Sequence, residues 1–322
     1  MLRVLMVVAV LAATAWGAYW FVGSRALDRT VTQVLDGHPA FTAEAHRVRG
    51  FPNRFDLTLT EPRLQSGAFR WQAPFLQVFA LSYRPHHLIV VLPHDQQANI
   101  AGQEAVLQSE DARASLVMTP GRMLPLERMA LVMQVARLQI DGRSHVADAL
   151  RIASRSEDAR LHEAVIEIEA AFPDPALMDA LDPDGHWPRR FDVLRLDGQV
   201  QFDRPLDRAA LSGTQPRPTA AQLTGARARF DEVDLVAEGV VEADEAGRLS
   251  GPVTLTVTGW PTLLQRLAEA GMIDPDQAGF LRPMLAGMAE SDNPERIQLE
   301  LTLRDGAIAV GPVTLARIPP LF

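Results

Sequence analysis

The densest group of side chains that could do chemistry is a histidine-rich run. His86 and His87 closely follow Tyr83, and His94 and Asp95 come a few residues later. Neutral imidazole binds Zn²⁺ and transfers protons, so a metal or catalytic role is one interpretation. In an extended strand, however, His86 and His94 would lie roughly 26 Å apart, and one ion could bind both only if the chain folded back. We therefore predict that these histidines make hydrogen bonds at strand ends.

Two acidic segments resemble fragments of calcium-binding loops. They are Asp182-Pro183-Asp184-Gly185 and Asp274-Pro275-Asp276. Calcium requires several converging oxygens and a bidentate acid some residues later, and that part of the loop is missing in both places. Proline suits turns and helix starts better. Glu167 and Glu169 share one face of a predicted strand, where solvent exposure explains them without acid–base catalysis.

Motifs of other enzyme classes are missing from the sequence. There is no G-x-S-x-G, and Ser212 lies in a proline-rich stretch rather than in a strained nucleophile turn. Neither a phosphate-binding glycine loop nor a dinucleotide fingerprint occurs. With no cysteine, the chain cannot use thiol catalysis, a disulfide framework, an acylated cysteine or a cysteine-based zinc site. We predict no catalytic residue, no metal and no cofactor; an enzyme would need a polar pocket assembled from residues far apart in the sequence.

Composition limits the class of protein. The 322 residues are 47% hydrophobic, enough for one extended β domain or two ordinary domains. The net charge of −9, with scattered arginines, provides no basic surface for nucleic acid or for an anionic membrane. We therefore expect no nucleic-acid partner.

The most specific segment is an uncharged apolar run that begins at Val4 and ends at Val22. At about 1.5 Å per residue in a helix, it comes close to the roughly 30 Å of a bilayer core. Aromatic residues gather at its far end, where such rings prefer the membrane–water interface. They are Trp16, Tyr19, Trp20 and Phe21. We predict a transmembrane signal anchor at residues 1–24 and a juxtamembrane helix at 25–40.

A cleaved signal peptide is the alternative interpretation. Ala13-Thr14-Ala15 would be its cleavage site, and an exposed aromatic terminus would remain after cleavage. Arg3 faces Arg25 and Arg29 across the run, so charge decides little about orientation. A short basic start before a long apolar run is typical of export. It predicts a single-pass inner-membrane protein with the bulk of the chain in the periplasm.

Beyond the anchor, period-two alternation of apolar and polar residues predicts a β-rich body. Examples are Phe55-Asp56-Leu57 and Ile166-Glu167-Ile168. The predicted fold is mainly β, a β-rich α+β protein with an extended antiparallel sheet, either curved or sandwich-like. Two halves are expected, residues 41–210 and 220–322, with a proline-rich linker at 211–219 between them.

Side-chain parity separates the Asp-Gly pairs, because residues that flank a two-residue hairpin loop must share a face. Asp305-Gly306 passes this test and predicts a hairpin, whereas Asp197-Gly198 fails it and predicts a glycine inside a strand. Helical spacing of apolar residues predicts a helix pair within residues 261–289, with Pro275 at the start of the second helix and Pro283 inside it. A third, short helix is expected from Pro175 to Leu181.

The segment from Gly50 to Leu57 is similar to the G-F-P-x-R-F-D-L signature of the domain of unknown function 2125 family of proteobacterial envelope proteins. Later blocks of the chain resemble that family as well. The residues that carry the resemblance are Gly50, Phe51, Pro52, Arg54, Phe55, Asp56, Trp71, Pro74, Tyr83, Pro85 and His94. The resemblance implies an anchored or exported envelope protein with no established activity. A weaker likeness is to AsmA-like lipid-transport proteins, which implies one N-terminal span and a curved sheet with an apolar groove.

Two functional hypotheses follow. The first is a non-enzymatic module, held to the membrane by one helix, whose body binds a lipid or another apolar ligand. The second is an interaction or scaffold domain for other envelope proteins, using strand edges or the aromatic-rich region from Gly50 to Tyr83. Alternation alone does not separate an open groove from a packed core.

Overall fold

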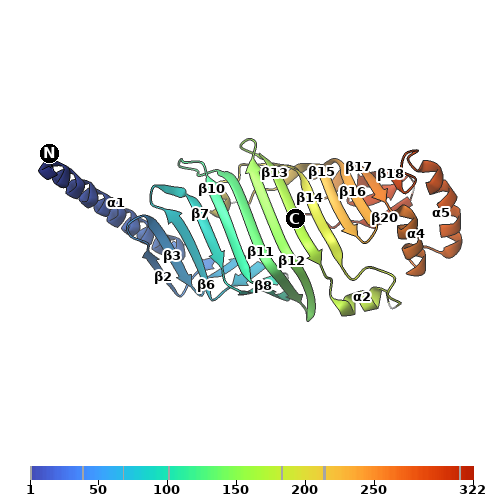
Figure 1. Ribbon diagram of the computed structural model, residues 1–322, viewed down its shortest axis with the longest axis horizontal. Helices are drawn as coiled ribbons and strands as arrows, with labels where there is room; N and C mark the ends of the chain where they lie inside the picture. The colour runs from blue at the N-terminus through green and yellow to red at the C-terminus, as the bar shows by residue number, and fades with distance from the viewer. Residues whose placement is uncertain are drawn as a thin grey trace. The chain divides into compact units, whose positions relative to one another are not determined.

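The computed structural model describes residues 2–37, 40–67, 69–100, 102–182, 184–212, 215–311 and 313–322. The fold is mainly β, with one long N-terminal helix and a few helices toward the C-terminus, which confirms the predicted fold class (Figure 1). Contacts divide it into two compact units. Unit 1 holds Met1–Pro120 and Met129–Gly142, and unit 2 holds Gly121–Arg128 and Arg143–Phe322. The predicted linker 211–219 lies within unit 2, and its Gly213 and Thr214 fall outside the described residues.

Helix α1 (Leu2–Gly37) is one continuous helix of 36 residues. It covers the predicted anchor and most of the predicted juxtamembrane segment, whose His38 and Pro39 fall outside the described residues. Gly23 lies inside the helix and does not interrupt it. By length and composition, α1 is the one helix among the described residues that could cross a membrane.

The strands of unit 1 form two antiparallel series, β2-β3-β6-β7-β10 and β1-β4-β5-β8-β9-β11. Their bounds are β1 (Phe41–Thr42), β2 (Ala45–Arg49), β3 (Arg54–Thr60), β4 (Arg63–Ser66), β5 (Phe69–Gln72), β6 (Phe75–Leu81), β7 (Arg84–Leu92), β8 (Asp95–Ile100), β9 (Gln103–Gln108), β10 (Asp111–Met118) and β11 (Leu126–Ile140).

The two series are joined by strands that bend instead of ending. Only two residues separate β3 from β4, β5 from β6, β7 from β8 and β9 from β10. Backbone bonding continues across these corners: the Glu61 N–H donates to Pro74 O at 2.9 Å, and the Ala73 N–H donates to Pro62 O at 3.2 Å. Three of the four corners contain a proline, Pro62, Pro74 or Pro93. Proline has no N–H to offer the ladder, so it suits a point where regular pairing is interrupted.

The strands of unit 2 follow one another as an antiparallel meander, each pairing with the next. They are β12 (Arg143–Ser156), β13 (Leu161–Ala171), β14 (Phe191–Phe202), β15 (Pro218–Phe230), β16 (Val233–Ala243), β17 (Leu249–Thr258), β18 (Arg296–Arg304), β19 (Ala307–Val310) and β20 (Val313–Arg317). Its helices are α2 (Pro175–Leu181), α3 (Ala209–Ser212), α4 (Trp260–Glu269) and α5 (Pro275–Met288).

Both parity predictions are confirmed. Leu303 pairs with Ile308 across the turn between β18 and β19. Gly198 lies within β14 at a register shift, and a Cβ there would stand 2.5 Å from the carbonyl oxygen of Gln222. Only glycine allows the two backbones to approach this closely.

The predicted helix pair is also confirmed. The side chain of Asp274 accepts a hydrogen bond from the Asp276 N–H, which caps α5, and Pro275 occupies its first turn. Helices α4 and α5 pack on the ends of β16, β17 and β18 through a cluster centred on Val257, Trp260, Leu264 and Ile297. This cluster and the neighbouring one around Val241, Val253, Leu301 and Leu303 form the core at the C-terminal end of unit 2.

Candidate functional site

Histidines of the histidine-rich run make local hydrogen bonds. His94 Nδ1 lies 2.5 Å from the carbonyl oxygen of Ser109, at the corner between β7 and β8. His87 Nε2 lies 3.0 Å from Ser115 Oγ. These are hydrogen bonds of the kind that the sequence predicts, and His94 makes its bond at a strand end. Within the described parts of the chain, no three His, Asp or Glu side chains come together as a metal site would require.

The acidic segments serve as turn and cap. Asp182 is buried, and its carboxylate accepts the N–H of Trp187 at 2.7 Å. This hydrogen bond is the main reason that the pKa of Asp182 is lowered. In the second segment, Asp274 caps α5. Pro183 falls outside the described residues.

One face of the second half of α1 packs on the strands and loops of unit 1. Its buried and half-buried residues recur at helical spacing, namely Gly17, Trp20, Gly23, Ser24, Leu27, Val31 and Leu35. Trp20 is the most central of them, with only 9% of its surface exposed. Its ring stacks on Phe55 at 6.1 Å between centroids and meets Phe51 edge-on at 5.3 Å. We call this contact between α1 and the strands the helix dock.

Hydrogen bonds fix the helix dock as well. Indole N–H groups donate to backbone carbonyls of the adjoining loop, Trp16 to Pro52 at 3.0 Å and Trp20 to Arg54 at 2.7 Å. The hydroxyl of Tyr19 donates to Ser82 O at 2.6 Å, in the turn between β6 and β7. Each N–H or O–H group of these aromatic rings therefore has a backbone acceptor, in a turn or at the start of β3.

The loop from Gly50 to Phe55 is shaped to receive the helix. Gly50 has φ of 104°, and a Cβ at this position would lie 2.7 Å from the carbonyl oxygen of Arg54. The guanidinium of Arg54 pairs with Asp56 at 2.8 Å. On the helix, a Cβ at Gly23 would stand 2.7 Å from Cζ of Phe55, so the glycine lets the helix lie directly on this ring.

Most of the family-motif residues fall into two places in unit 1. Gly50, Phe51, Pro52, Arg54, Phe55 and Asp56 build or flank the loop of the helix dock, and Tyr83 follows Ser82, whose carbonyl oxygen binds Tyr19. Pro85 is exposed in β7. Trp71, Pro74 and His94 lie at or beside the bent corners, where Trp71 Nε1–H donates to the buried Gln96 at 3.1 Å.

Sequence reasoning missed the helix dock. It assigned the aromatic residues at the end of the apolar run to the membrane interface and gave the Gly50 motif no structural role. The available signal was the stripe that begins at Gly17 and Trp20 and continues past Gly23 at helical spacing. A stripe that long requires a protein surface to pack on.

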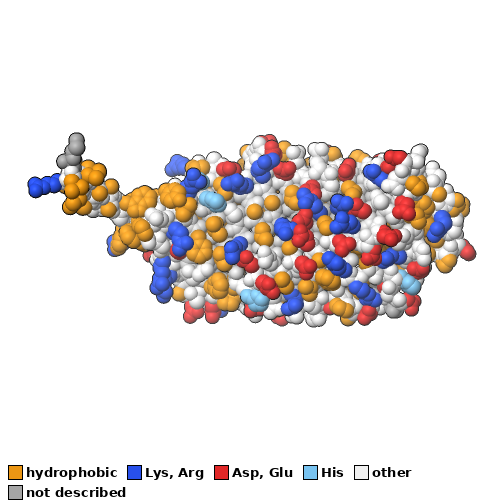
Figure 2. Space-filling model, in the orientation of Figure 1, with side chains coloured by type: hydrophobic (Ala, Val, Ile, Leu, Met, Phe, Trp, Pro, Cys, Tyr) orange, Lys and Arg blue, Asp and Glu red, His pale blue; other side chains and the backbone are white. Residues whose placement is uncertain are grey.

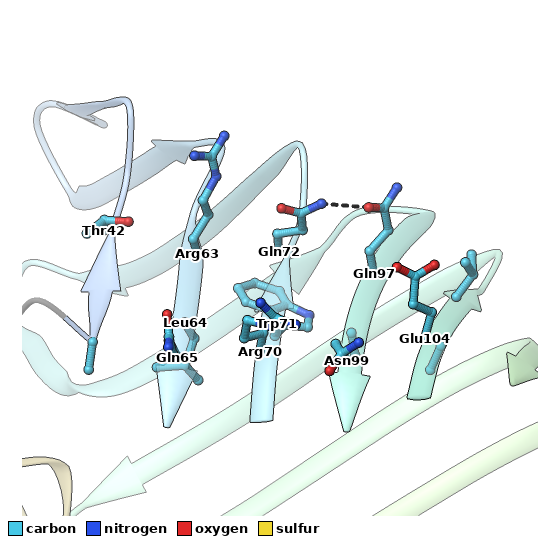
Figure 3. Close-up of a pocket in the computed structure, with 14 residues that line it drawn as sticks. Thr42, Arg63, Leu64, Gln65, Arg70, Trp71, Gln72, Gln97, Asn99 and Glu104 are labelled. Carbon is cyan, nitrogen blue, oxygen red and sulfur yellow. Dashed lines mark hydrogen bonds between the residues drawn. The ribbon is translucent and has the colours of Figure 1, made fainter. Parts of the chain in front are cut away.

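A polar groove of about 540 Å³ lies along β1, β4, β5, β8 and β9 of unit 1 (Figure 3). Its lining includes the side chains of Arg63, Arg70, Gln72, Gln97 and Glu104, with Trp71 among them. Gln72 donates to Gln97 at 2.6 Å across the strands. Leu64, Trp71 and Val106 also line this groove, so it is amphipathic and not a purely apolar pocket.

One face of the unit 2 sheet is covered by ion pairs. Arg195 binds Glu167 and Asp197 at 2.6 Å each, and Arg151 binds both Glu167 and Glu169. These bonds lower the pKa of Glu167, with the Arg195 contribution the larger. Figure 2 shows Arg and acidic side chains interspersed over the strands of unit 2.

The opposite face of the same strands is apolar. Ile152, Ile166, Leu196 and Ala226 stand side by side across β12, β13, β14 and β15. A parallel row holds Leu150, Ile168, Leu194 and Ala228. Ile166 remains 38% exposed and Leu196 40% exposed, although they pair directly with each other. Helices α4 and α5 pack on β16 to β18, away from these two rows, which we call the open apolar face.

Comparison with known proteins identifies the family. A family model described as an uncharacterized protein conserved in bacteria, domain of unknown function 2125, matches residues 20–319. The chain therefore belongs to that family, and the matched region begins at the central residue of the helix dock. No curated protein and no solved structure matches the chain.

Proposed function

We propose that this member of the domain of unknown function 2125 family is an inner-membrane-anchored, periplasmic protein whose β-rich body binds the acyl chain of a lipid or a similar apolar ligand. The observation that carries the proposal is the open apolar face of unit 2. Aliphatic side chains that remain 38–40% exposed at the centre of a sheet are a surface that water solvates poorly.

The anchor is supported by the exposed half of α1. Residues 2–15 are all exposed, and they carry no charge apart from Arg3. A long apolar helix face without a protein partner is stable in lipid and costly in water. The periplasmic side is inferred from the signal-like start. Retention of the helix is favoured because its second half packs on unit 1.

The ligand class follows from the shape and chemistry of the open apolar face. Its two rows cross four strands, which at about 4.8 Å per strand gives a strip on the order of 15 Å long. That length suits an extended hydrocarbon chain. Polar hydrogen-bonding groups are sparse in these rows, so a sugar or nucleotide would lose its hydration there without compensation.

Photo-crosslinking tests the proposal. The full chain would be reconstituted with a phosphatidylcholine that carries a photoactivatable acyl chain, and crosslinked peptides would be mapped by mass spectrometry. We expect crosslinks on peptides from β13 and β14 in addition to those on α1. Leu196→Ser should reduce the β13 and β14 crosslinks about tenfold, since losing one leucine contact with an acyl chain costs about 1.5 kcal/mol.

The matched control is Val240→Ser. Val240 is 50% exposed and pairs with Gln222. The side chains of both residues lie on the face of the sheet opposite the open apolar face. This variant should keep the crosslinks of the parent protein. If lipid crosslinks are confined to α1, the anchor stands and lipid binding by the body is wrong. Reproducible crosslinks from the open apolar face to another envelope protein in cells would favour the scaffold function instead.

A further inference from the structure

The charge of Arg3 bounds the apolar run of α1 at one end, and the part of the run that precedes the helix dock is too short to cross a bilayer by itself. Residues 2–15 lie before the helix dock, and at about 1.5 Å per residue they span roughly 21 Å of the roughly 30 Å hydrocarbon core. The remaining distance of about 9 Å corresponds to about six more residues of helix. These are residues 16–21, in which Trp16 and Tyr19 already donate hydrogen bonds to the turns at Pro52 and Ser82.

Two further aromatic residues of unit 1 contact this stretch of helix or directly adjoin a residue that does. Phe51 meets the ring of Trp20 at 5.3 Å, and a Cβ at Gly17 would be 3.9 Å from the Phe51 ring. Tyr83 follows directly on Ser82, whose carbonyl oxygen accepts the hydroxyl of Tyr19. Both rings nevertheless point largely away from protein, since Phe51 is 60% exposed and Tyr83 is 58% exposed.

We propose that the rim of unit 1, namely the loop between β2 and β3 with Phe51 and the turn between β6 and β7 with Tyr83, enters the membrane interface together with α1. Phe51 and Tyr83 then lie in lipid at the depth of Trp16 and Tyr19. This inference rests on the membrane anchor of the proposed function. If residues 16–21 complete the span, the side chains that touch them are carried to the same depth. The occupant of this surface is the bilayer itself.

Interfacial placement accounts for the exposure of these rings. Phe51 leaves a large apolar ring uncovered, which is unfavourable in water and favourable among acyl chains. Tyr83 has an apolar ring and a polar hydroxyl, the combination that prefers the headgroup level. The carbonyl oxygens of Pro52, Arg54 and Ser82 already accept hydrogen bonds from α1, so part of the rim backbone reaches this depth with its polar groups satisfied.

Depth can be measured because the chain has no cysteine. A single cysteine would be introduced into the full-length protein at Phe51, Tyr83, Val8 or Gln103, labelled with a nitroxide and reconstituted into phosphatidylcholine vesicles. Val8 is 56% exposed in the free half of α1, and Gln103 is exposed at the start of β9. Figure 1 shows β8, the partner of β9, well apart from α1. Collision rates with oxygen and with a water-soluble nickel chelate report depth.

We expect the nickel accessibility of Phe51→Cys and Tyr83→Cys to be at least threefold lower than that of Gln103→Cys, with oxygen accessibility between the Gln103 and Val8 values. If Phe51→Cys fails to fold, Asn53→Cys reports the depth of the same loop, since Asn53 makes none of the ring contacts. If the label at Val8 lies in lipid while labels at Phe51, Asn53 and Tyr83 are as accessible to the nickel chelate as the label at Gln103, the rim lies in water and the inference is wrong. If Val8 itself is open to the nickel chelate, the anchor is wrong and the inference falls with it.

Discussion

Replacing Trp20 with alanine should release the second half of α1 from unit 1. The side chain is 9% exposed, packs on two phenylalanine rings and donates a 2.7 Å hydrogen bond. Truncating a buried Trp costs about 3–5 kcal/mol. We take about 3 kcal/mol, because the half-buried Leu27 and Val31 further along the packed stripe are unchanged in the variant. At 1.4 kcal/mol for each factor of ten, the ratio of docked to undocked helix should fall about a hundredfold.

A cysteine at Ser24 can report this change. Ser24 is 9% exposed in the helix dock, and the chain has no other thiol. In membrane-reconstituted full-length protein, the docked state should protect Ser24→Cys from a maleimide, and adding Trp20→Ala should raise the labelling rate by up to about a hundredfold. The control is Phe21→Ala, since Phe21 adjoins Trp20 but is 56% exposed. Its rate should stay within about twofold of the parent rate.

Equal labelling rates for the Trp20 and Phe21 variants would refute the reasoning. Such a result would mean that packing elsewhere along the stripe holds the helix and that the ring contacts add little. Fast labelling of Ser24→Cys in the parent background would refute the helix dock itself.

Three further outcomes are expected. Gly50→Ala should lower the melting temperature by several degrees, because alanine is strained at φ of 104° and its Cβ would meet the backbone of Arg54. The control Gly67→Ala should lower the melting temperature less, because the space around Gly67 is open. His162 is buried, and burial lowers its pKa below 6.5. The unfolded chain therefore binds a proton at a higher pH than the folded chain does, and the free energy of unfolding should fall as the pH drops below about 6.5. His162→Gln should flatten this pH dependence in urea titrations at different pH values. Leu264→Ala should cost about 2–5 kcal/mol in urea denaturation and Phe280→Ala less than about 0.5, since these side chains are 4% and 73% exposed; equal losses would contradict the assigned packing of α4 and α5.

Local features of the fold were predictable because they depend on neighbouring residues. The parity of side chains across two residues separates the hairpin at Asp305-Gly306 from the glycine inside β14 at Gly198. Proline and a capping aspartate mark the start of α5 for the same reason, since Asp274 and Asp276 meet within one turn. None of these features requires knowledge of the rest of the chain.

The bent strands of unit 1 were not predictable from local pattern. Prolines at Pro62, Pro74 and Pro93 interrupt the alternation, so each corner looks like the end of one strand and the start of another. What makes it a bend is a partner far along the chain, such as Pro74 accepting the N–H of Glu61. The helix dock has the same origin, because the burial of Trp20 depends on Phe55, which lies 35 positions further along the sequence.

The helix dock also constrains either proposed function. From Gly17 to Leu35 the packed stripe covers about five turns, or roughly 27 Å of helix, so α1 and unit 1 should move as one body. A flexible linker would let the strands of unit 1 sample many heights above the membrane, whereas this arrangement holds the rim of unit 1 at a fixed depth. An acyl chain or a partner protein that approaches along the membrane would therefore meet that rim in one orientation. The labelling rate at Ser24 and the depth of Phe51 consequently test one rigid connection by two independent measurements.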